Sequence, residues 1–512
     1  MPLAPADNSW LGTLGDSSAL PQEMWNGTPR AFVTAALPQL GATNSPALQD
    51  LARRLLLSNA ASPRGQDSPD RPSLAALRLD RLEALGQVAG ALAIMDELPD
   101  ESTADNLDRA RVELRFAAND PDGACHAVNE RMGRYQSNWW DRALIACQAL
   151  SGDSGKAALG LSLLREQKAP PDPVFDALIE VIGGQARKID KLPDPTPMRM
   201  ALFAATKLPL PTDALNSAGP AALHLYATNS AVPVERRLAA AERAANYGAL
   251  TAAELGELYQ KFEFKPEEQA AVLRDPKPPS DAKGRAILYA VARSNAPTET
   301  RASAVASLLT EAKRRGGFLA MAQLVAPLLG DMRPESGPEG FAADGARALL
   351  VTGREGPAAA WISASGAREL WLVARLAATP PLGATDENAP LQQVFVTLIS
   401  RNSSTGPAQV GLLLSLLAAF DVPLDALDPA PLLAPPHEAQ LPSAALWVGQ
   451  RHAAADKRVG ETLLASLLIA QAGDRLTLEP ILLGRTIAGL LAIGLDAEAH
   501  ALAVEAAISA GI

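Results

Sequence analysis

Apolar segments along the chain alternate with short polar turns that contain Gly, Asn, Asp or Pro. Three of these turns recur at a constant spacing of 33 residues, at Gly86, Asn119 and Gly152. Each is followed five positions later by a small residue, namely Ala91, Ala124 and Ala157. A Gly or Asn can take the left-handed conformation that ends a helix, and an alanine lets two helices approach closely. The pattern therefore predicts stacked helical hairpins.

The composition also favours an all-helical fold. Hydrophobic residues make up 48% of the 512 residues and aromatic residues only 4%, and Ala and Leu are abundant. Ala and Leu favour helices, whereas strands require the β-branched and aromatic residues that are sparse here. A chain of this length exceeds one compact core, so we expect several domains or a repeat array.

Residues 74–185 resemble tetratricopeptide-like α-solenoids, whose 34-residue unit carries small residues where its helices cross, and weaker copies lie near 236–262 and 476–510. The chain departs from that family in lacking the Trp, Leu-Gly, Tyr and terminal Pro positions of its consensus. The resemblance implies an α-solenoid of stacked antiparallel helical hairpins that binds proteins. The Ala/Leu-rich composition is also similar to that of secreted alphaproteobacterial proteins of unknown role.

Pro-rich stretches suggest where the chain divides. We expect an extended N-terminal segment (1–27), a helical-hairpin repeat array (28–262), a Pro-rich connection (263–283) and a C-terminal helical array (284–512). The last of these either continues the superhelix or forms a separate helical domain.

The net charge of −11 disfavours nucleic acid as a partner, because a phosphate backbone would be repelled. The densest basic run, Lys313 to Arg315, is typical of a helix C-terminus, where cations are favoured. The apolar run from Val410 to Phe420 is too short to cross a bilayer, so we expect no membrane span.

Motifs for catalysis or metal binding are weak. Residues 152–155 (Gly-Asp-Ser-Gly) are similar to the nucleophile loop of serine proteases but fall at a predicted helix–helix turn. Ser280 and Lys283 match a Ser-x-x-Lys pair without its companion motifs, and Ser280 is a natural helix cap. The histidines do not pair at metal-ligand spacing; they are His126, His224, His437, His452 and His500. We expect no cofactor, no metal ion and no enzymatic site.

Cys125 and Cys147 are the two cysteines of the chain. If one helix ends near Met132 and the next begins near Trp139, both thiols lie at the same level of an antiparallel pair and can form a disulfide. Such a bridge persists in the periplasm but not in a reducing cytosol. The alternative is that both are small buried hydrophobic residues. With an N-terminus that reads like a processed secretory chain, the pair favours the periplasm over the cytoplasm.

Three tryptophans are candidates for contact with a partner: Trp10, Trp25 and Trp139. We expect Trp140 to fill the core of its hairpin and Trp139 to cover the rim. Trp10 and Trp25 lie outside any predicted helix, where their segment either caps the first hairpins or docks into another protein.

These features favour a non-catalytic scaffold or adaptor that binds proteins in a bacterial envelope assembly, with the flagellar motor and secretion or pilus machinery as possible hosts. One alternative is a periplasmic hydrolase or lyase, which would need converging carboxylates with perturbed pKa values. The other is a helical protein that binds a lipid or small molecule in an enclosed apolar cavity.

Overall fold

The structure is a computed structural model that describes residues 10–15, 17–67, 72–98, 105–275, 277–377, 391–401, 405–422, 424, 443–471 and 480–512. His437 lies outside these residues. The described chain is all-helical, with one isolated bridge between Pro29 and Arg64, and this confirms the predicted all-α, solenoid-like fold. None of the described helices is long and apolar enough to cross a membrane.

The chain forms two compact units, each built from several segments. Unit 1 draws on Met1–Glu23, Pro29–Ala42 and Leu56–Thr251. Unit 2 draws on Met24–Thr28, Thr43–Leu55 and Ala252–Ile512. The division into segments 1–27, 28–262, 263–283 and 284–512 stays a prediction from the sequence.

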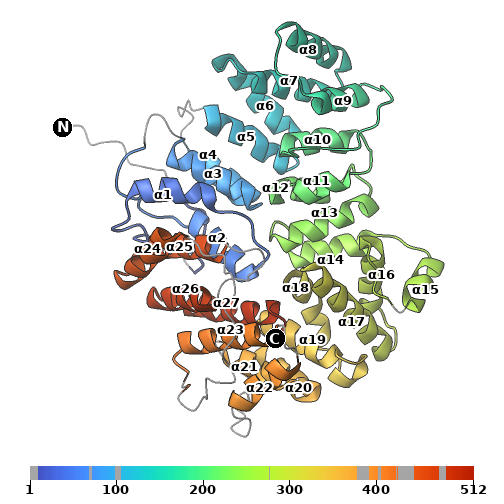
Figure 1. The fold of residues 1–512 in the computed structure, drawn as a ribbon. Coiled ribbons are helices and arrows are strands. Elements are labelled where there is room, and N and C mark those ends of the chain that lie inside the picture. Colours follow the sequence, from blue (N-terminus) through green and yellow to red (C-terminus); the bar gives the residue numbers. More distant parts are fainter. Residues whose placement is uncertain are drawn as a thin grey trace. The chain divides into compact units, whose positions relative to one another are not determined.

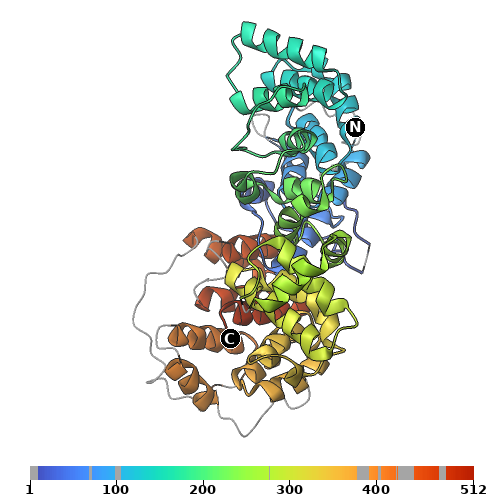
Figure 2. The same ribbon diagram turned by 90° about the vertical axis from the view of Figure 1, so that its right-hand side faces the viewer.

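Unit 1 contains twelve helices among its described residues. They are α1 (Arg30–Ala36), α3 (Leu74–Ala84), α4 (Val88–Glu97), α5 (Asp105–Ala117), α6 (Pro121–Arg131), α7 (Asn138–Leu150), α8 (Ser154–Glu166), α9 (Pro173–Ile182), α10 (Pro197–Ala205), α11 (Thr212–Ser217), α12 (Pro220–Thr228) and α13 (Val234–Asn246). Consecutive helices pack as hairpins, among them α5 with α6, α7 with α8 and α12 with α13 (Figure 1). In the view of Figure 2 the blue-to-green helices of this unit are stacked in successive layers.

The 33-residue spacing marks the turns of successive helical hairpins, as predicted. Gly86, Asn119 and Gly152 occupy the turns of three successive hairpins with φ values of +73°, +57° and +83°. The three alanines that follow are at most 1% exposed, because they lie where the helices of each pair cross; they are Ala91, Ala124 and Ala157. The regular spacing ends after α9, where residues 183–196 lead to α10 without an intervening helix.

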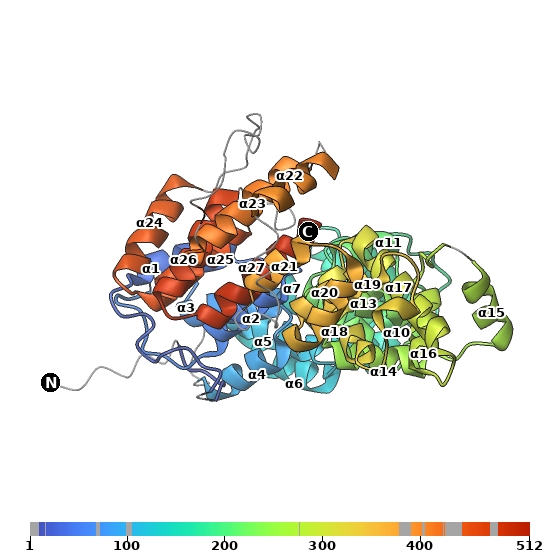
Figure 3. The same cartoon turned by 90° about the horizontal axis from the view of Figure 1, so that it is seen from below.

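Unit 2 contains α2 (Pro46–Leu57) up to Leu55 and the helices from α14 onward. These are α14 (Ala252–Lys261), α15 (Pro266–Arg274), α16 (Ala282–Arg293), α17 (Thr298–Arg315), α18 (Phe318–Leu329), α19 (Phe341–Val351), α20 (Glu355–Ser365), α21 (Glu369–Arg375), α22 (Leu391–Arg401), α23 (Gly406–Ala419), α24 (Ala444–Ala455), α25 (Val459–Ala470), α26 (Pro480–Ala492) and α27 (Asp496–Ser509). Hairpins recur, as in α16 with α17, α19 with α20 and α24 with α25. Figure 3 shows α22 to α26 side by side, with α23 packed on α26.

Unit 2 also brings helices from distant parts of the chain together. The last helix, α27, packs on α19 and α21, so this unit is more than a succession of nearest neighbours. The start of α2 belongs here because Glu505 on α27 accepts hydrogen bonds from Ser45 Oγ at 2.5 Å and from Ala47 N at 2.9 Å. The carboxyl group thus satisfies a donor of the first turn of α2, which the helix itself leaves unpaired.

Two local features of unit 2 differ from the prediction, the 263–283 connection and the N-cap of α16. The Pro-rich connection 263–283 contains a helix, α15. The cap of α16 is Asp281, whose carboxylate accepts a hydrogen bond from Gly284 N at 3.0 Å, and not Ser280 as expected. Asp281 directly precedes the first helical residue, which is the position from which a side chain reaches the amides of the first turn.

Candidate interaction surface

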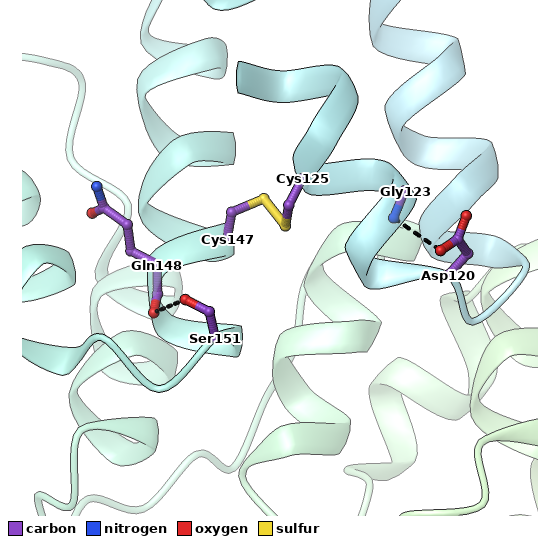
Figure 4. The surroundings of a disulfide bond; sticks show 6 residues. All are labelled: Asp120, Gly123, Cys125, Cys147, Gln148 and Ser151. Atoms are coloured by element: carbon purple, nitrogen blue, oxygen red, sulfur yellow. Dashed lines mark hydrogen bonds between the residues drawn. A yellow bond between two sulfur atoms is a disulfide. The ribbon is translucent and has the colours of Figure 1, made fainter. Parts of the chain in front are cut away.

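The predicted cysteine pair joins two helices of unit 1. Cys125 on α6 and Cys147 on α7 have their Sγ atoms 2.11 Å apart, the distance of a disulfide bond, and their Cα atoms 5.4 Å apart (Figure 4). The first helix ends at Arg131 and the second begins at Asn138, close to the expected bounds. The bridge therefore fixes the hairpin that contains α7 to the one that contains α6.

The tryptophans at the start of α7 lie as expected, one inside and one at the edge. Trp140 is 1% exposed, and its Nε1 donates a hydrogen bond to Asp105 Oδ1 at 2.7 Å. Trp139 is half-buried; its ring meets Trp140 edge-on at 4.9 Å and lies 5.3 Å from the guanidinium carbon of Arg109. Trp139 thus keeps a surface that another protein can reach.

Trp10 and Trp25 are buried within this chain. Trp10 is fully buried in unit 1, where the guanidinium of Arg78 lies over its ring at 4.7 Å. Trp25 is 1% exposed in unit 2 and packs on Gly460, where an added Cβ would come within 2.6 Å of the indole ring. Neither tryptophan can touch a partner unless its segment first detaches.

An apolar groove lies between α7 and α8 in unit 1. Its cavity volume is about 250 Å³, and it is lined by Asp141, Leu144, Ile145, Gln148, Lys156, Leu159, Gly160, Leu163, Leu164 and Gln167. Leu159 and Leu163, one turn apart on α8, are 61% and 46% exposed. Isolated exposed leucines are ordinary, but two beside a groove form a contiguous apolar surface.

The floor of this groove is tightly packed and carries one polar atom. A Cβ added at Gly160 would come within 2.5 Å of Ile145, so the glycine allows α7 and α8 to approach closely. Gln148 Oε1 is buried and has no hydrogen-bond partner among the described residues. A buried acceptor without a donor is costly to the fold.

This surface was not predicted from the sequence. Its signal lies in α8, where Leu161 and Leu164 fill the core while Leu159 and Leu163 point elsewhere. A helix of a two-layer array needs one apolar stripe, so a second stripe marks a face without an intramolecular neighbour.

Two carboxyl groups with raised pKa values interact with each other, Glu83 on α3 and Glu113 on α5. Burial and the charge of Glu113 raise the pKa of Glu83 to about 8. Burial also raises the pKa of Glu113 to about 7, against the opposing effect of hydrogen bonds from Met198 N, at 2.9 Å, and Thr196. Because Glu113 binds the first turn of α10 in this way, its role in the fold is to hold α10.

The loop 152–155 and two of the histidines make structural contacts. Ser154 begins α8 at the hairpin turn, and the neighbouring Asp153 pairs with Lys156 at 2.5 Å. His126 lies beside Glu130 and His500 beside Leu376 O, in different units. Within the part of the chain that the structure describes, no three His, Cys, Asp or Glu side chains lie close enough to hold a metal ion.

Comparison with known proteins finds neither a protein-family model nor a curated protein that matches this chain. The resemblance to tetratricopeptide-like solenoids therefore rests on the hairpin spacing and the helical fold.

Proposed function

We propose that this protein is a non-catalytic scaffold that binds other proteins through its helical array. The observation that carries the proposal is the groove between α7 and α8 with its two exposed leucines. The outer helices of solenoids are normally polar where they face water, since an open apolar face promotes association. An apolar outer face on α8 therefore favours a surface that a partner covers.

The chemistry of the groove indicates an amphipathic helix as the partner segment. Two apolar residues one turn apart on that helix would pack on Leu159 and Leu163. An acidic residue of that helix would lie near Lys156, whose side chain is 69% exposed. Separating Lys156 from Asp153 costs little, because exposed ion pairs contribute little.

The cysteine pair supports a place in an oxidising compartment. A disulfide between packed helices is stable in the periplasm and is reduced in the cytosol. We therefore place the scaffold in a bacterial envelope assembly, with the flagellar motor and secretion or pilus machinery as host classes, and keep the cytoplasm as the alternative.

The test is crosslinking and affinity capture from the native host with matched variants. Leu159→Asp with Leu163→Asp puts two charges on the groove, and Leu273→Asp is the control, because Leu273 on α15 is 42% exposed but lies in unit 2. We expect a partner that the wild type and the control recover equally and that the double variant recovers at least tenfold less, since each buried leucine contributes about 1.5–3 kcal/mol. A partner retained equally by all three proteins, or none at all, would refute the proposal.

A further inference from the structure

Unit 2 contains a second cavity, of about 390 Å³, at the junction of four helices. It lies between the end of α17, the start of α18, α19 and the end of α27, beside Asn44, which precedes α2. The side chain of Asn44 donates a hydrogen bond to Gly316 O at 3.2 Å and so holds one wall in place. The volume falls within the range of sites that bind small organic molecules.

One side of this cavity is cationic. Lys313 Nζ lies 2.5 Å and Arg347 Nη1 lies 3.0 Å from the same oxygen, Oδ1 of Asp344. Both cations therefore contact the carboxylate of Asp344. Arg347 Nε donates to Ile512 O at 2.8 Å, while its Nη2 has no partner among the described residues.

Apolar side chains also line the cavity. Phe318 and Leu319 in the first turn of α18 and Ile508 near the end of α27 line it, and each is 6–8% exposed. Buried rings and aliphatic side chains hold the body of a ligand by removing its surface from water, whereas charged groups fix its orientation.

We propose that this cavity binds a small organic carboxylate with a short apolar body. The carboxylate would lie between Lys313 Nζ and the Nη2 donors of Arg347, two donors that match its two oxygens. The apolar body would pack on Phe318, Leu319 and Ile508. This inference does not depend on the proposed protein-binding groove, which lies in unit 1.

The experiment is isothermal titration of the full chain with octanoate, octan-1-ol and octyl phosphate as probes. Lys313→Met removes the more exposed cation and keeps the length of the side chain, while Arg347 still pairs with Asp344. Lys283→Met is the matched control, because Lys283 is an exposed lysine of unit 2 outside the cavity. Circular dichroism shows that each variant folds.

We expect octanoate to bind at least tenfold more tightly than octan-1-ol, because only the carboxylate engages the cations. Lys313→Met should weaken octanoate binding about tenfold and leave octan-1-ol unchanged, while Lys283→Met changes neither. Equal affinities for octanoate and octan-1-ol, or octanoate binding that ignores Lys313, would overturn the proposal. Tighter binding of octyl phosphate with the same dependence on Lys313 would replace carboxylate by phosphate as the recognised group. Absence of binding by all three probes would rule out the site.

Discussion

Breaking the bond between Cys125 and Cys147 should destabilise one part of unit 1 selectively. The bond closes a loop with a sequence separation of 22 residues. In the chain-entropy description, a loop of this length stabilises the folded state by about 3 kcal/mol, since it limits the freedom of the unfolded segment. The segment spans the end of α6 and most of α7, so the loss falls on these two helices.

Hydrogen exchange with mass spectrometry measures this effect helix by helix. Amides of α6 and α7 that exchange only through opening of this segment should exchange roughly 100-fold faster when the bond is absent, because about 1.4 kcal/mol corresponds to a factor of ten. Reduced wild type should agree with Cys125→Ala combined with Cys147→Ala, which separates the loss of the bond from the change of side chain. Peptides of α16 and α17 in unit 2 serve as the internal control.

Two results would refute this reasoning. Equal exchange of α6 and α7 with and without the bond would mean that the loop is already constrained by packing. A uniform acceleration in both units would mean that the bond acts on the global stability of the chain and not on its own segment.

Two further buried groups lead to predictions. Burial raises the pKa of Glu505 from 4.5 to about 7, against the opposing hydrogen bond from Ser45. The folded state therefore favours the protonated carboxyl group. Its contribution to the free energy of unfolding is complete below pH 4.5 and is lost as the pH rises through 7. Denaturant titrations should show the wild type losing about 3 kcal/mol relative to Glu505→Gln over that range, and parallel curves would contradict this. Arg78→Met should leave Leu56 O, which now accepts from Arg78 Nε at 2.6 Å, without its donor. The unpaired carbonyl should destabilise the packing of the segment around Trp10 by about 2 kcal/mol. Chymotrypsin should therefore cleave after Trp10 roughly 30-fold faster. An unchanged cleavage rate would mean that other contacts hold the segment around Trp10 in place.

The sequence predicted what depends on local spacing. The turns at Gly86, Asn119 and Gly152 follow from backbone conformations that few residues adopt, so the hairpin interval was visible in the chain. The approach of Cys125 and Cys147 followed from two adjacent helices and one short connection.

The parts that were not predicted depend on contacts between distant residues. Glu505 binds Ser45 across 460 positions, and no local pattern marks a glutamate in the middle of an Ala-rich helix as the cap of another helix. Lys313 was correctly placed at a helix C-terminus, yet its position beside Arg347 in a cavity required the packing of α17 on α19. Packing of Trp25 on Gly460 likewise depends on a remote segment, whereas burial of Trp10 agrees with the predicted alternative that its segment packs on the chain.

The same spacing that predicts the array also explains why its groove is exposed. In a stack of hairpins each outer helix is covered by the next hairpin, and the regular interval here ends after α9. The face of α8 that carries Leu159 and Leu163 therefore has the composition of an internal helix, yet both leucines are exposed among the described residues. The opposite wall is α7, in which Gln148 directly follows Cys147. A bond that restrains α7 thus also restrains the wall of the groove, so a partner would meet a surface already in its binding conformation and would spend less of its binding energy on ordering it.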